Sequence, residues 1–92
     1  MIGFIVHAKH DQVGVAVKDI AAGEQVEGWC MEDDSTLSVI SNKEIPLGHK
    51  VAITTVKQGH PLIKYGMPIG NATADISVGD HVHTHNLKTT RW

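Results

Sequence analysis

A short connection motif occurs four times in this chain and limits the folds that the chain can adopt. Each copy contains an apolar residue, two further residues and a glycine, and a new apolar segment begins shortly after the glycine. The copies lie at residues 19–23, 44–48, 55–59 and 75–79. Glycine adopts positive φ at little cost, so each copy predicts a tight turn that reverses the chain. The spacing between copies is irregular, which indicates a reused local turn and not a solenoid repeat.

Short apolar segments lie between these turns, and none has the length and period of a helix. Strands are expected over residues 2–7, 13–17, 26–31 and 36–40. Glycine, proline and β-branched residues interrupt every longer candidate. We therefore expect one all-β domain over residues 1–92, with many short strands and room for one-turn helices in the connections. A sheet of this size leaves edges that a partner or a second copy of the chain could cover.

The charge and the cysteine content limit the binding partners and the cellular compartment expected for the chain. The formal net charge is −2 with neutral histidines, which gives no basic field for nucleic acid. Cys30 is the only cysteine, so no intrachain disulfide can form, and we expect it to be a small, partly buried hydrophobe, with a nucleophile as the alternative. The apolar run over residues 1–6 is too short for a membrane span or a signal peptide. We expect a cytoplasmic protein with no nucleic-acid or membrane partner.

Three histidines, His81, His83 and His85, occupy alternate positions near the end of the sequence. In an extended strand they would share one face, with neighbours about 6.6 Å apart. Two such imidazoles could converge on one metal ion with bonds of about 2 Å, whereas His81 and His85 would lie about 13 Å apart. We therefore expect an adjacent pair of ligands, for which iron(II), manganese or zinc is better suited than magnesium. The alternative is a solvated edge strand that binds no metal.

Residues 64–70 form a second informative segment. Two glycines bracket Met67 and Pro68, so the backbone is expected to turn sharply there between two short strands. Lys64 and Tyr65 would then stand at the edge of a turn. A cation and a phenol at this place could bind an anionic substrate group or assist proton transfer. The alternative is a surface lysine beside a packed tyrosine.

His49 and Lys50 directly follow the glycine of the second connection. They form a basic pair that could join the same anion site. The other histidines have no obvious partner in the sequence, and we expect each to be an isolated surface or turn residue: His7, His10 and His60.

Three sequence blocks resemble the signature blocks of the SAF domain in the altronate dehydratase family. They are LGHKVA at residues 47–52, IKYGMPIG at residues 63–70 and GDHVHTHN at residues 79–86, and their order and spacing also match. The similarity covers essentially the whole chain. The segment 84–92, with Gly28 and Trp29 upstream, is similar to the sulfolactate sulfo-lyase branch of the family. In this family the domain is fused to a large catalytic region or encoded separately as a small subunit, and this chain resembles the separate form.

The resemblance implies a β-clip fold and an elimination reaction that depends on a divalent metal, commonly iron. Loss of water from a sugar acid, or of bisulfite from sulfolactate, would leave an enol that rearranges to a 2-keto acid. We expect a large catalytic subunit as partner and no activity of the chain alone. The alternative is a non-catalytic module that binds a sugar acid or a metal, or that only orders its partner.

The candidate site residues follow from these arguments. The metal ligands are expected among His81, His83 and His85. The candidates for a catalytic contribution at the contact with the large subunit are His83, His85 and Lys64, with Lys64 facing the substrate carboxylate. The substrate-binding candidates are Lys64, Tyr65, His49, Lys50 and Asn86.

Overall fold

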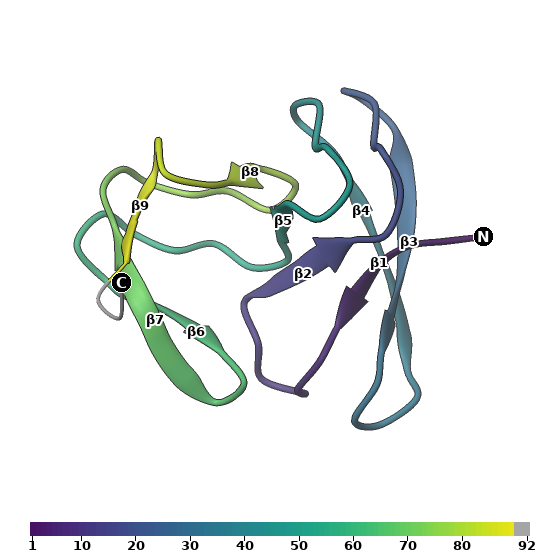
Figure 1. Ribbon diagram of the computed structural model, residues 1–92, viewed down its shortest axis with the longest axis horizontal. Coiled ribbons are helices and arrows are strands. Elements are labelled where there is room, and N and C mark those ends of the chain that lie inside the picture. The colour runs from purple at the N-terminus through teal and green to yellow at the C-terminus, as the bar shows by residue number, and fades with distance from the viewer. Residues whose placement is uncertain (90–92) are drawn as a thin grey trace.

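The computed structural model describes residues 1–89, and this part of the chain is built from short strands (Figure 1). The strands are β1 (Ile2–Val6), β2 (Val13–Ala16), β3 (Gln25–Cys30), β4 (Thr36–Ile40), β5 (Lys50–Ala52), β6 (Pro61–Lys64), β7 (Met67–Ala72), β8 (His81–Val82) and β9 (Leu87–Thr89). The all-β prediction is confirmed. The one-turn helices are not found in residues 1–89, where hydrogen-bonded turns form the connections instead.

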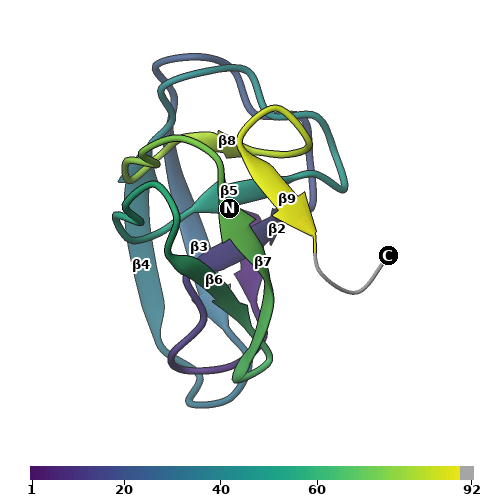
Figure 2. The same cartoon turned by 90° about the vertical axis from the view of Figure 1, so that its left-hand side faces the viewer.

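The strands form two sheets. The larger sheet has six strands in the order β4-β3-β1-β2-β5-β8, and the smaller has three in the order β6-β7-β9. All neighbouring strands are antiparallel except β1 and β3, which run parallel. The smaller sheet, on the left of Figure 1, lies on the side of the molecule away from β3 and β4, and Figure 2 shows it facing the viewer.

The four repeated connections form two pairs that bridge each other. Ile20 and Ile45 exchange two backbone hydrogen bonds of 2.9 Å, and Val56 and Ile76 exchange bonds of 2.9 and 2.7 Å. All four side chains are buried, so each pair also places its apolar anchors in the core. The glycines that end the connections have φ between 82° and 90°, which confirms the predicted turns. Their mutual pairing is an additional feature that only the structure shows.

Buried apolar side chains form two clusters. In the first, the Phe4 ring occupies the space opposite Gly28 and Gly14, where a Cβ would lie 2.0 and 2.5 Å from ring atoms. Cys30 packs in this cluster as a small hydrophobe, as predicted, and is more completely buried than expected. The second cluster contains residues of both sheets, among them Val82 and Leu87. It therefore anchors both ends of the segment that carries His83 and His85.

The hairpin between β6 and β7 turns earlier than expected. Tyr65 and Gly66 form the turn, with φ values of 55° and 69°. Met67 already begins β7, so the prediction that the Met67-Pro68 pair makes the turn is wrong. Lys64 is the last residue of β6 and therefore lies directly before the turn. No helix in residues 1–89 has the length and apolar character needed to cross a membrane.

Candidate functional site

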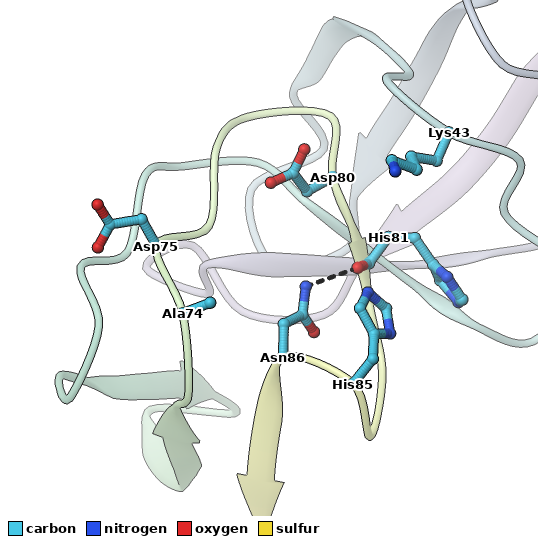
Figure 3. A pocket seen from close by; sticks show the side chains of 7 residues that line it. All are labelled: Lys43, Ala74, Asp75, Asp80, His81, His85 and Asn86. Atoms are coloured by element: carbon cyan, nitrogen blue, oxygen red, sulfur yellow. Dashed lines mark hydrogen bonds between the residues drawn. The ribbon is translucent and has the colours of Figure 1, made fainter.

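The shortness of β8 determines where the three alternating histidines lie. The strand ends at Val82, and the chain turns over residues 83–86, so the expected extended strand through His85 is wrong. Asn86 holds this turn because its Nδ2 donates to the His81 carbonyl oxygen at 2.8 Å and its Oδ1 accepts from the His83 N–H at 3.0 Å. Figure 3 shows the first of these bonds. Both ends of the buried Asn86 amide are therefore used inside the turn.

His49 lies beside His81 and His83 because β5 pairs with β8. The antiparallel register places Val51 opposite His81 and Lys50 opposite Val82, so one step further places His49 opposite His83. The rings of His49 and His83 stack with their centres 4.4 Å apart. His49 Nδ1 lies 2.8 Å from His81 Nε2. We call these three residues the imidazole cluster.

The imidazole cluster has the dimensions of a metal site. One ring nitrogen from each of the three histidines lies within 4.8 Å of the other two. A tetrahedral ion with bonds of about 2 Å holds its ligand atoms about 3.3 Å apart, so the three rings would have to rotate for their nitrogens to converge on one ion. Iron(II), manganese and zinc all accept imidazole ligands. The residues present therefore fit a divalent transition metal, with further positions left for oxygen ligands.

His49 was expected in an anion site, and only the structure shows its place among potential metal ligands. His85 lies outside this group of three, although its ring centre is 5.2 Å from that of His81. Its role as a ligand stays a prediction. Burial lowers the pKa of His81, and the neighbouring imidazoles His49, His85 and His83 lower it further. A lowered pKa keeps His81 in the neutral form that metal ions bind.

Lys64 forms the centre of a second group. Its side chain is only 9% exposed, and its Nζ lies 3.0 Å from Nδ1 of His7 and 3.9 Å from the centre of the Tyr65 ring. The His7 and Tyr65 rings stack with their centres 4.7 Å apart. The prediction that His7 is isolated is therefore wrong. No sequence signal links His7 to Lys64, because 57 positions separate them.

Two neighbouring hollows connect these groups. One, of about 260 Å³, is lined by Lys50, Val82, His83, Thr84, Leu87 and Thr89. The other, also of about 260 Å³, is lined by Lys50, Lys64, Tyr65, Ile69, Leu87 and Thr89. The two share Lys50, Leu87 and Thr89 in their lining, so His83 of the imidazole cluster and Lys64 border neighbouring hollows. We call the hollow that both lysines line the cationic hollow, because two positively charged side chains suit an anionic ligand.

A third hollow, of about 230 Å³, lies beside His81 and is drawn in Figure 3. It is lined by Lys43, Ala74, Asp75, Asp80, His81, His85 and Asn86. Its carboxylates have structural partners: Asp80 accepts from Asn42 and from the Ser77 N–H, each at 2.8 Å. Asp75 likewise accepts from the Gln58 N–H at 2.8 Å. These carboxylates hold the repeated connections in place.

The predicted substrate-binding residues fall into three places. Three of them, Lys50, Lys64 and Tyr65, line the cationic hollow. His49 belongs to the imidazole cluster, and Asn86 fixes the turn over residues 83–86. Their contacts with a substrate stay predictions. A divalent ion held by the three imidazoles, next to the two lysines, would suit a ligand with both chelating and anionic groups.

Fold and site together define an all-β SAF-type domain that carries an imidazole cluster next to a cationic hollow. The chain belongs to the altronate/galactarate dehydratase SAF domain family, which it matches over residues 2–90. The resemblance seen in the sequence is therefore confirmed.

Relatives of two architectures share this domain. The chain is 44% identical over 92 residues to the (2R)-sulfolactate sulfo-lyase subunit alpha of Chromohalobacter salexigens, with 99% of this chain and 98% of that protein covered. It is 48% identical over 60 residues to the subunit of the same name from Paracoccus pantotrophus, covering 65% and 90%. It is also 39% identical over 89 residues to altronate dehydratase of Bacillus subtilis, covering 97% of this chain and 17% of the dehydratase.

Proposed function

We propose that this chain is the small subunit of a two-subunit lyase and supports an elimination that yields a 2-keto acid through its enol. The substrate would be sulfolactate, which loses bisulfite, or a sugar acid, which loses water. The observation that carries the proposal is that the hollow beside His83 of the imidazole cluster and the cationic hollow share Lys50 in their lining. Similarity over nearly the full length of a relative named as a subunit supports a separate small subunit.

Each group has a role that its chemistry supports. His49, His81 and His83 would hold a divalent ion, iron(II), manganese or zinc, while His85 lies at the rim of the site. When bound, such an ion supplies Lewis-acid stabilisation of the negative charge that develops next to the substrate carboxylate. The Lys64 ammonium would bind an anionic group of the substrate, and Lys50 stands between the two sites. The principal acid and base would belong to the large subunit.

The experiment is reconstitution of the chain with the large subunit recovered from its native lysate. The complex is assayed for sulfite and for 2-keto acid, so that sulfite release selects the sulfo-lyase reaction. We expect His49→Ala and His83→Ala to reduce turnover at least tenfold, while the exposed His10→Ala serves as control. Unchanged turnover in both variants would favour the alternative, a non-catalytic module that only orders its partner.

A further inference from the structure

His7 and Lys64 meet although they come from different sheets. His7 follows the end of β1, and Lys64 ends β6. Lysine side chains are rarely buried without a partner, yet Lys64 is only 9% exposed. Its polar neighbour is the His7 ring, with the two nitrogens 3.0 Å apart. The His7 nitrogen therefore provides the hydrogen-bond acceptor that the buried ammonium requires.

Only one proton can lie between these two nitrogens. A lysine ammonium has donors and no acceptor, so His7 Nδ1 must offer its lone pair and carry its own proton on Nε2. Asp11 supplies negative charge close by: it is 2% exposed, and its Oδ1 has no hydrogen-bond partner among residues 1–89. One carboxylate balances one cation. A second proton on the pair would add an unbalanced positive charge in a partly buried place.

Tyr65 completes the arrangement. It has a φ of 55°, which is unusual for a residue with a side chain. Its ring stacks on His7 and lies under the Lys64 ammonium. These two contacts stabilise a backbone conformation that is otherwise unfavourable. The turn, the ring and the ammonium are therefore fixed with respect to one another.

We propose that His7 is a positioning residue for Lys64: its Nδ1 accepts a hydrogen bond from the ammonium and holds that charge at the cationic hollow, where it meets a carboxylate or sulfonate. The Asp11 carboxylate balances the positive charge of the Lys64 ammonium. Only the binding of an anion by the Lys64 ammonium depends on the proposed function. The hydrogen bond and the state of the ring do not depend on it.

The charges around the pair agree with this assignment. Burial lowers the pKa of His7, the Lys64 charge lowers it further, and Asp11 opposes both effects. Burial also lowers the pKa of Lys64, where Asp11 acts in the raising direction and Lys50 in the lowering direction. The neutral imidazole is thus favoured beside the charged lysine.

The first test is nuclear magnetic resonance of the full chain, which needs no partner. Long-range ¹H–¹⁵N spectra should show His7 neutral near neutral pH, with Nε2 protonated and Nδ1 not. In Lys64→Met the His7 pKa should rise, while Lys9→Met, a change at an exposed lysine two residues from His7, should leave it unchanged. A proton on Nδ1 of the unmodified chain, or an equal response to both variants, would overturn the proposal.

The second test uses the reconstituted lyase. Because the ammonium would bind the same anion in the ground and transition states, His7→Gln should raise KM roughly tenfold and change kcat little. The matched control is His10→Gln, which alters an exposed histidine. Equal KM values in the two variants would contradict the positioning role. A complex without activity would refute the proposed function. The nuclear magnetic resonance result would still decide, independently, whether His7 Nδ1 accepts a hydrogen bond from Lys64.

Discussion

Gly79→Ala should destabilise the chain much more than the same change at the three equivalent glycines. All four have φ between 82° and 90°. A Cβ built at Gly79 lies 2.0 Å from the carbonyl oxygen of Ile40, whereas nothing lies within 4 Å of a Cβ at Gly23, Gly48 or Gly59. Four positions with similar φ therefore differ most in the space beside the α-carbon.

The expected magnitudes follow from these two effects. An alanine in the left-handed region costs about 1–2 kcal/mol, and this is the whole effect expected at the three open sites. At Gly79 the backbone of Ile40 must also move, which adds about 1–3 kcal/mol. The hydrogen bond from the Asn42 N–H to the Gly79 carbonyl, now 2.9 Å long, would weaken by about 1 kcal/mol. The total of about 3–6 kcal/mol is a large part of the stability of a small domain.

Urea unfolding followed by circular dichroism measures these differences. The four variants are compared at equal m values, so that a change in midpoint reports a change in free energy of unfolding. Because His81 lies two residues after Gly79, the displaced backbone should also weaken zinc binding to the folded variant. The reasoning is refuted if Gly79→Ala and Gly59→Ala unfold at the same urea concentration.

Other predictions concern the site itself. His83→Ala should reduce zinc affinity of the full chain at least tenfold, or about 1.4 kcal/mol, in calorimetry, whereas His10→Ala should not; equal affinities would exclude His83 as a ligand. Asn86→Ala removes two hydrogen bonds and should cost about 1–3 kcal/mol of stability in urea unfolding, with weaker zinc binding. The pKa values of His7 and His81 are lowered, so the unfolded chain binds more protons below pH about 6.5. The free energy of unfolding should therefore fall as the pH decreases below about 6.5. A free energy of unfolding that does not change with pH in this range would contradict the lowered pKa values.

The sequence predicts the local elements well because short-range patterns determine them. The β-branched residues Thr36, Val39 and Ile40, with a turn at residues 32–35 before them, predict a strand over residues 36–40, and β4 occupies those residues. The glycine of each connection predicts positive φ, which all four show. In these places the conformation depends on a few neighbours in the chain.

Two local expectations fail because side chains compete with the pattern. Alternation predicts an extended strand through His85, but the Asn86 amide bonds to the backbone of His81 and His83 and closes a turn. A turn at Met67-Pro68 is expected because glycine favours turns. The structure turns at Tyr65, whose positive φ depends on contacts with His7 and Lys64 that no local pattern shows.

The histidine and lysine groups are not predictable from the sequence, because pairing between distant segments creates them. β5 follows the second connection and β8 follows the fourth, and these connections belong to different bridged pairs. The Gly79 N–H donates to the Ala52 carbonyl and the Ala52 N–H donates to the Asp80 carbonyl, which joins the two pairs.

The imidazole cluster therefore forms where the two bridged pairs of connections meet. His49 follows the connection that contains Ile45, in the first bridged pair, whereas His81 and His83 follow the connection that contains Ile76, in the second. A metal ion bound there would stabilise only the folded domain, because the three nitrogens lie within 4.8 Å of one another only when β5 pairs with β8. The strand pairing that completes the fold is thus the same pairing that creates the candidate site.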